Sequence, residues 1–277
     1  MTAFRELRQA VAVAATPLEE RLANIKASLK RDLPWLHQLP EYGKGKFSPI
    51  AIVGGGPSLI NTFNWELAGY RFPTVMIAGS AHEWAASNLT ARPRYYVVSD
   101  PDADVTVRYI PKYVDPLATY LVASHCHESV FEVLKGCPVV LWHCLDDAYK
   151  PFLDEHRPNW TAVGGGCTVG LRAIAIAILL GYSDIHLFGF DSCLGPNGEH
   201  HAYPFAAGEE LGETMEVKIG DPSSPKTYRC EPYHIAQAKN FEAFWQAHKK
   251  SFTPVFHGGG LMSDVYDAIK GFEGQEL

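Results

Sequence analysis

Short runs of consecutive apolar residues recur along most of the chain and predict buried strands. These runs cover residues 50–53, 74–78, 95–99, 118–123, 139–142, 185–188 and 253–256. Helix-like stretches separate them, and the most apolar one covers residues 169–180. Continuous apolar strands that alternate with helices are typical of a parallel sheet covered on both faces. The pattern therefore predicts an α/β fold with a Rossmann-like, doubly wound and mainly parallel sheet.

The first part of the chain shows a helical period instead. Apolar residues recur at three- and four-residue spacing, namely Leu7, Val11, Ala14, Leu18, Leu22, Ile25 and Leu29. Such a stripe predicts an amphipathic helix, which Pro34 and Pro40 then end. We therefore predict a helical extension over residues 1–47, used for packing or for joining two subunits, and a main domain over residues 48–277.

Charge and composition narrow the classes of partner. The chain has 24 Lys and Arg against 31 Asp and Glu, a net charge of −7. Proteins that bind nucleic acid usually carry a basic surplus, so no such partner is expected. The most apolar stretch, Ala173 to Tyr182, is shorter than the roughly 20 residues that a membrane span needs. Six cysteines in a chain of this length do not form a disulfide scaffold, so we expect a cytoplasmic protein.

Small or polar residues follow nearly every predicted strand, in the segments GGGPS, GS, SDP, GFD and HGGG. Ligands of open α/β sheets lie beyond the carboxyl ends of the strands. The sequence therefore predicts one ligand site formed by these segments.

Two glycine-rich segments stand between a strand and a helix. The first, Gly54 to Ser58, lacks the lysine of a P-loop and the glycine spacing of the dinucleotide fingerprint. The second, Gly164 to Gly170, precedes the most apolar helix, with Cys167 or Thr168 as its cap. Backbone N–H groups at such helix starts favour anions such as phosphate, and both segments are also compatible with plain tight turns.

Carboxylates at two strand ends are candidates for chemistry. Asp100 and Asp191 each follow a strand directly. A carboxylate there can hold a ribose hydroxyl, a metal ion or a reacting hydroxyl, or it can simply cap a turn. The histidines and cysteines form no C-x-x-C pair and no H-E-x-x-H motif, so no structural zinc site is predicted.

Together these motifs resemble a known family. The segments IAIVGGGPSL, RPRYYVVSDP and GGGCTVGLRAIAIAILLGYSDIHLFGFD, followed by GEHHAY, resemble the MptE-like proteins in order and spacing over roughly residues 48–265. That family includes archaeal 6-hydroxymethylpterin pyrophosphokinases and motility accessory factors that glycosylate flagellin. The same order of motifs is similar to bacterial sialyltransferases that use a CMP-activated nonulosonic acid.

The sialyltransferase likeness implies a nucleotide-binding site. It places the nucleotide phosphate at Gly54, Gly55, Gly56, Pro57 and Ser58. Further residues implied around the nucleotide are Ser80, Gly166, Thr168, Gly170, Gly189 and Asp191. The family has asparagines where this chain has Ser80 and Asp100, and a serine where it has Val169.

The resemblance also implies the catalytic groups. His234 stands roughly where the family has its base, and His201 is the rival for that role. The segment from Tyr228 to His234, rich in Pro, Tyr and Arg, is predicted to be a loop, either a mobile flap over the site or an inert part of the surface. In a pyrophosphokinase, Asp100, alone or together with Asp191, would hold a magnesium ion on ATP.

We therefore expect a nucleotide-dependent transferase, foremost a sialyltransferase-like glycosyltransferase that uses a CMP-activated sugar and a small-molecule or glycan acceptor. The alternatives are an ATP- and magnesium-dependent pyrophosphokinase of the 6-hydroxymethylpterin type and a nucleotide-binding module without catalysis. The resemblance implies no tightly bound cofactor, and the N-terminal helix suggests a homo-oligomer.

Overall fold

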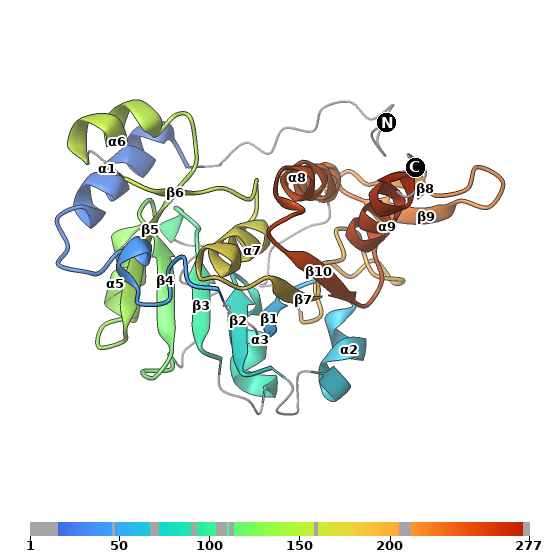
Figure 1. Ribbon diagram of the computed structural model, residues 1–277, viewed down its shortest axis with the longest axis horizontal. Coiled ribbons are helices and arrows are strands. Elements are labelled where there is room, and N and C mark those ends of the chain that lie inside the picture. Colours follow the sequence, from blue (N-terminus) through green and yellow to red (C-terminus); the bar gives the residue numbers. More distant parts are fainter. Residues whose placement is uncertain are drawn as a thin grey trace.

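One large parallel sheet organises the molecule (Figure 1). The computed structural model describes residues 16–45, 48–66, 72–89, 93–103, 110, 114–157, 160–204 and 212–273. Within them, eight strands pair in the order β10-β7-β1-β2-β3-β4-β5-β6, and all of these pairs are parallel. In chain order the strands are β1 (Ile50–Val53), β2 (Thr74–Ala78), β3 (Tyr95–Val98), β4 (Thr119–Ala123), β5 (Val139–Cys144), β6 (Ala162–Val163), β7 (Asp184–Phe188) and β10 (Thr253–His257). The predicted doubly wound α/β fold is confirmed.

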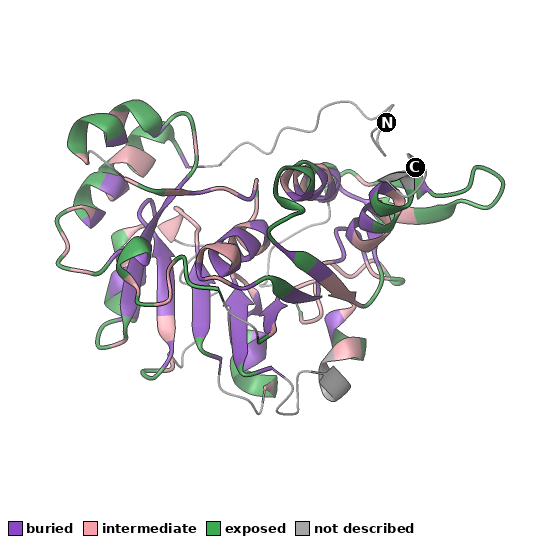
Figure 2. Cartoon of the chain, viewed as in Figure 1, coloured by how far each residue is buried: buried purple, intermediate pink, exposed green. Residues whose placement is uncertain are grey.

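The apolar runs became strands because both faces of the sheet are covered. Every residue of β1, β2, β3 and β5 is buried, and Figure 2 shows the same for the centre of the sheet. The predicted runs agree with the observed strands to within two residues at each end. Strand β6 was not predicted, because a strand of two residues is too short to show a hydrophobic period.

Helices cover both faces of the sheet. They are α1 (Leu18–Ser28), α2 (Leu59–Glu66), α3 (Ala81–Asn88), α5 (Glu128–Val133), α6 (Lys150–His156), α7 (Val169–Leu179), α8 (Pro232–His248) and α9 (Leu261–Glu273), with a 3-10 turn η1 (Leu36–Gln38). Crossovers between parallel strands are right-handed. The connections from β1 outward to β6 and the return connection through α7 therefore lie on opposite faces, and α7 packs on β1, β2 and β3. None of the described helices combines the length and the apolar character that a membrane span requires.

The strand order reverses between β1 and β7. From β1 the chain moves outward through β2 to β6, and α7 then carries it back to β7 on the other side of β1. The connections after β1 and after β7 leave the sheet in opposite directions, which opens a crevice at the carboxyl ends of these two strands.

The N-terminal extension covers the far edge of the sheet. Leu141 of β5 donates its N–H to the Pro34 carbonyl at 2.8 Å, and Trp35 bridges to the same strand. Ile25 of α1 and Leu36 of η1 are buried in the main core. The described part of this extension therefore packs on the sheet, whereas Leu7, Val11 and Ala14 lie outside the described residues.

An antiparallel hairpin stands apart from the sheet. It pairs β8 (Met215–Ile219) with β9 (Lys226–Cys230), and it packs on α8 and α9 through a small core that includes Val217 and Cys230. The prediction of a loop from Tyr228 to His234 is therefore wrong. Tyr228 lies in β9 and His234 in the first turn of α8, because Pro232 occupies the first helical position, where its missing N–H costs nothing.

Candidate functional site

A cleft lies at the crevice between the ends of β1 and β7, with a cavity volume of about 140 Å³. The residues that line it come from seven segments of the chain, some in loops and some in helices or strands, that lie far apart in the sequence. They are Gly54, Gly55, Gly56, Pro57, Ala78, Ser80, Thr168, Val169, Gly170, Gly189, Phe190, Asp191, Ser192, Cys193, His200, His201, Tyr233, His234, Gln237 and Met262. The glycine-rich turn after β1 and the start of α7 thus meet at one edge of the sheet, as predicted.

The glycine turn after β1 forms a wall of the cleft. The N–H groups of Gly54 and Gly56 donate to the carbonyls of Phe188 and Gly189 at 2.8 and 2.9 Å, which ties the turn to the end of β7. A side chain at Gly56 would collide with the Asp191 carboxylate, and Gly189 has a φ of 67° that favours glycine. The amides of Gly54 and Gly56 are therefore already bonded within the fold.

Helix N-termini face the cleft instead. Ser80 precedes α3, and Thr168 caps α7 by accepting the Leu171 N–H at 3.4 Å. Tyr233 and Met262 lie in the first turns of α8 and α9. Each helix start carries partial positive charge, and none of the described lining residues is a lysine or arginine. The cleft can thus attract an anion through backbone dipoles alone.

Asp191 contributes the one carboxylate among the described lining residues. Its side chain accepts the Ser58 N–H at 3.2 Å, and the residue is only 5% exposed. Burial raises the pKa of Asp191 to about 6, against the opposing effect of the hydrogen bonds from Ser58. The carboxylate is therefore costly to keep ionised until a ligand donates to it.

His234 presents a donor to the cleft. Its Nδ1 accepts the backbone N–H of Glu231 at 3.1 Å, so the neutral ring carries its proton on Nε2. Burial, together with the neighbouring His200 and His201, lowers the pKa of His234 to about 3. A neutral imidazole with Nε2–H can donate a hydrogen bond to a ligand oxygen.

His201 has the opposite tautomer. It lies 3.1 Å from the Gly55 carbonyl through Nδ1, which must therefore be the donor, and this places the lone pair of the neutral ring on Nε2. The ring stacks on Tyr203, whose hydroxyl donates to Ser80 Oγ at 2.8 Å. The segment around His201 is thereby fixed onto the glycine turn.

A third histidine is bound on both ring nitrogens. His200 Nε2 lies 3.3 Å from Glu231 Oε2, and His200 Nδ1 lies 2.9 Å from the Tyr233 hydroxyl. His200, Glu231 and Tyr233 were not predicted as site residues from the sequence. The only signal was the pair of adjacent histidines in GEHHAY, because Glu231 and Tyr233 are some thirty residues away in the sequence.

The cleft gathers most of the predicted site residues. Those that line it are Gly54, Gly55, Gly56, Pro57, Ser80, Thr168, Gly170, Gly189, Asp191, His201 and His234. Ser58 lies directly behind it, bound to Asp191, and Gly166 lies against the side chain of Asn240.

Asp100 is not among the described lining residues. Its carboxylate accepts the Asp102 N–H at 2.9 Å, and burial raises its pKa. β3 stands two strands away from β1 in the sheet, and its end is bonded through the Ser99 carbonyl to His125, which in turn is bonded to Asn24 of the N-terminal helix.

The covered edge holds its own polar chain. Arg21 of α1 donates to the Tyr149 hydroxyl at 2.9 Å, and Tyr149 lies 3.1 Å from His125 Nδ1. His125 Nε2 lies 2.7 Å from the Ser99 carbonyl and is therefore the donor there. Arg21, Tyr149 and His125 thus link the N-terminal helix to the ends of β3 and β4.

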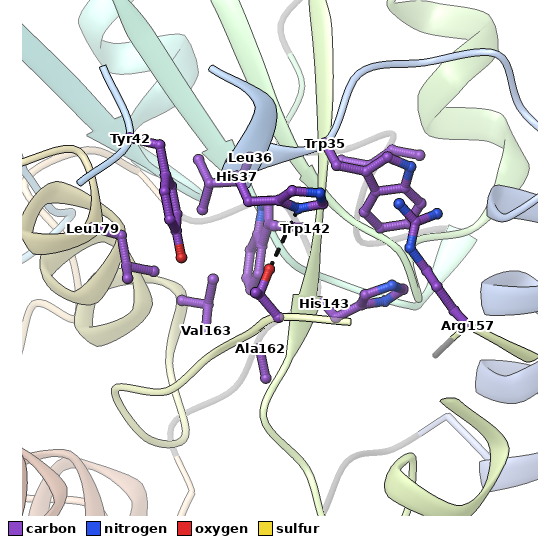
Figure 3. A pocket seen from close by; sticks show the side chains of 12 residues that line it. Trp35, Leu36, His37, Tyr42, Trp142, His143, Arg157, Ala162, Val163 and Leu179 are labelled. Atoms are coloured by element: carbon purple, nitrogen blue, oxygen red, sulfur yellow. Dashed lines mark hydrogen bonds between the residues drawn. The ribbon is translucent and has the colours of Figure 1, made fainter. Parts of the chain in front are cut away.

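A second hollow lies between the extension and strands β5 and β6 (Figure 3). His37 and Thr161 form a hydrogen bond of 3.4 Å across it, and Arg157 stacks on Trp35. Its cavity volume of about 10 Å³ has room for no more than one water molecule. It therefore joins the extension to the sheet and does not form a ligand site. Across the described ranges, no group of three or more His, Cys, Asp or Glu side chains is arranged to hold a metal ion.

Comparisons with known proteins agree with this fold. A comparison with curated protein sequences finds no match. Among solved structures, the MAf glycosyltransferase from Magnetospirillum magneticum AMB-1 superposes with a TM-score of 0.62 at 14% identity, covering 91% of this chain and 38% of that one. A mammalian sialyltransferase, solved with Gal-beta-1-3GalNAc-ortho-nitrophenol, gives a TM-score of 0.43 at 11% identity over 94% and 89% of the two chains.

The chain spans about two fifths of the length of the MAf glycosyltransferase, so the likeness concerns the fold of this part. The family described as 6-hydroxymethylpterin diphosphokinase MptE-like matches residues 19–197, which include the glycine turn, α7 and the end of β7. With a match over more than half of its length, the chain belongs to the MptE-like family.

Proposed function

We propose that the chain is a nucleotide-dependent transferase of the glycosyltransferase type and that its cleft binds the nucleotide part of an activated sugar. The observation that carries the proposal is the convergence of helix N-termini and one buried carboxylate at the point where the strand order reverses. The fold shared with a glycosyltransferase supports it. The specific donor we propose is a CMP-activated sugar.

The roles follow from the donors and acceptors in the cleft. The starts of α7 and α8 would bind the phosphate, and His234 would donate from Nε2 to an oxygen on which charge develops as the sugar leaves. Asp191 would accept from the hydroxyl groups of the ribose or the amino group of the base. His234 is therefore proposed as a donor and not as the base, because its Nδ1 already accepts a backbone N–H.

The family description favours a second candidate, transfer of diphosphate from ATP to a hydroxymethyl group. Magnesium on the nucleotide would need carboxylate ligands. Asp191 is the one carboxylate among the described lining residues, and Asp100 is not among them, so the predicted metal role of Asp100 finds no support.

A thermal-shift series with CMP, CTP, ATP and ADP, each with and without magnesium, separates the two. On our proposal CMP raises the melting temperature without metal, since a ligand at a hundredfold excess over its Kd adds about 2.7 kcal/mol to apparent stability. Stabilisation by ATP only in the presence of magnesium would favour the diphosphokinase instead.

The transfer itself is tested by release of free CMP from a CMP-sugar in the presence of a glycan acceptor. Gly170→Val is the informative variant, because Gly170 lines the cleft in the first turn of α7 and already lies against the Phe190 ring. Its control is Gly271→Ala, where a new Cβ would meet nothing within 4 Å. Unchanged CMP binding by the Gly170 variant would place the nucleotide elsewhere.

A further inference from the structure

We propose that Tyr233, His200 and Glu231 form a proton relay in the wall of the cleft, with the Tyr233 hydroxyl as the group that takes the proton from the acceptor. This inference rests on the proposed transferase function and assigns the base that the function requires. Tyr233 would be the catalytic residue, and His200 and Glu231 would position and polarise it.

The contacts among these three residues set the direction in which a proton can move, from the Tyr233 hydroxyl to His200. Glu231 Oε2 lies 3.3 Å from His200 Nε2, and a proton on Nε2 facing this carboxylate leaves His200 Nδ1 as the acceptor for the Tyr233 hydroxyl at 2.9 Å. The His200 and Tyr233 rings are nearly parallel, inclined by 18° with their centroids 6.2 Å apart. The order carboxylate, imidazole, hydroxyl is that of a nucleophile or base activated by a histidine.

Burial sorts the three residues by role. The side chains of Glu231 and His200 are 7% and 10% exposed, whereas Tyr233 is 36% exposed and lines the cleft. Glu231 is fixed further by the backbone N–H of Gly212, which donates to its Oε1. The Glu231 carboxylate is thus held in the interior of the protein, whereas the Tyr233 hydroxyl lies at the surface of the cleft, where an acceptor would enter.

The neighbouring histidines are less suited to the task. His234 carries its proton on Nε2 and faces the cleft as a donor. His201 has its lone pair on Nε2, but its Nδ1–H is bound to a neutral carbonyl, that of Gly55. A carboxylate stabilises an imidazolium far better than a carbonyl does, and only His200 has one as a described partner.

The transfer step balances with this relay. The acceptor oxygen attacks the anomeric carbon of the activated sugar, and its O–H bond breaks as the proton moves to the Tyr233 oxygen. The original phenolic proton moves to His200 Nδ1 and gives an imidazolium paired with Glu231. The bond between the anomeric carbon and the phosphate oxygen breaks, and its electron pair leaves with the nucleotide.

The kinetic test compares Tyr233→Phe, His200→Gln and the double variant in CMP release from a CMP-sugar. Proton transfer of this kind contributes about 10²–10⁴-fold. We expect each single variant to lower kcat by that order with the KM for the donor unchanged, and the double variant to lose no more than the worse single one. The control is Tyr228→Phe, in β9 outside the cleft, which removes a phenol that donates to Asp264 of α9. Multiplying losses, or a full loss in His201→Gln with none in Tyr233→Phe, would overturn the relay.

A second measurement needs no turnover and so separates the relay from the proposed function. Nitrogen-15 NMR of the imidazoles reports which ring nitrogen carries the proton. We expect His200 to be protonated on Nε2, with an Nδ1 resonance that shifts in Tyr233→Phe, while Glu231→Gln changes the Nε2 signal. Protonation on Nδ1, or an Nδ1 resonance indifferent to Tyr233→Phe, would refute the relay. Absence of CMP binding and release by the wild type would instead refute the transferase proposal.

Discussion

The carboxyl edge of the sheet carries two tyrosine–histidine pairs in opposite settings. Tyr149 and His125 are bound at the ends of β3 and β4, under the N-terminal helix, and Tyr233 and His200 line the open cleft at the ends of β1 and β7. The first pair ends on the Arg21 cation and a backbone carbonyl, and the second ends on the Glu231 carboxylate. The first pair is enclosed beneath the N-terminal helix, where His125 Nε2 also lies 3.8 Å from Cys144 Sγ, whereas the second pair opens on the cleft. The same two side chains therefore brace the fold in one place and are suited to move a proton in the other.

The largest expected difference is in stability. His125→Ala removes a side chain whose ring nitrogens are both bound inside the protein, and we expect it to cost about 3 kcal/mol of unfolding free energy. His201→Ala, in the wall of the cleft, is expected to cost less than about 1 kcal/mol. Urea unfolding of both variants measures the two values, and equal losses would mean that the cleft is as tightly packed as the covered edge.

The next effect concerns Asp191 and pH. Its folded pKa of about 6 lies above the ordinary value of 3.8, so the folded state binds the proton more tightly than the unfolded state does. The protonated Asp191 carboxyl contributes fully to the free energy of unfolding below pH 4, and this contribution is lost as the pH rises through 6. Asp191→Asn, which stays neutral, should therefore exceed wild type in stability by about 2 kcal/mol at pH 8 and match it near pH 4.

Chemical denaturation across that pH range decides the matter. Asp184→Asn, at the exposed start of the same strand, controls for the removal of one negative charge. If Asp191→Asn raises the free energy of unfolding equally at all pH values, burial does not destabilise the ionised Asp191 carboxylate.

A third prediction compares the contributions of Asp191 and Asp100, the carboxylates at two strand ends, to the binding of CMP. On the proposed function, Asp191→Asn should weaken CMP binding by about tenfold, because a hydrogen bond to a charged group is lost. Asp100→Asn should leave the affinity unchanged, since Asp100 is absent from the described lining of the cleft. Isothermal titration with CMP gives both values, and the reverse ranking would restore the sequence-based role of Asp100.

The smallest effect tests the two tyrosines. Tyr149→Phe leaves Arg21 and His125 Nδ1 without this partner in the interior, and we expect a loss of about 1 kcal/mol. Tyr233→Phe removes a hydroxyl from a residue that is 36% exposed and should change stability by less than about 0.5 kcal/mol. If thermal unfolding ranks them the other way, the relay hydroxyl is a structural contact.

The apolar runs determined the parallel sheet and nearly all of its strands, because a strand covered on both faces needs apolar side chains along its whole length. The sequence also allowed the prediction of the glycines after β1, the cap at Thr168 and the acid Asp191 after β7. These features depend on local backbone geometry and on position at the end of a strand. The β8–β9 hairpin could not be predicted in this way, because its short strands face solvent on one side and the Pro, Tyr and Arg content of residues 228–234 is typical of a loop.

What only the tertiary structure decided is which strand ends form the cleft and which histidine nitrogen faces it. Asp100 and Asp191 look alike in sequence, and the strand order separates them by placing β3 beyond β2 and under the extension. The three cleft histidines likewise differ only in their partners: Gly55 for His201, the Glu231 backbone for His234 and the Glu231 carboxylate for His200. Proton position depends on a hydrogen bond formed in space, and residues far apart in the chain supply it.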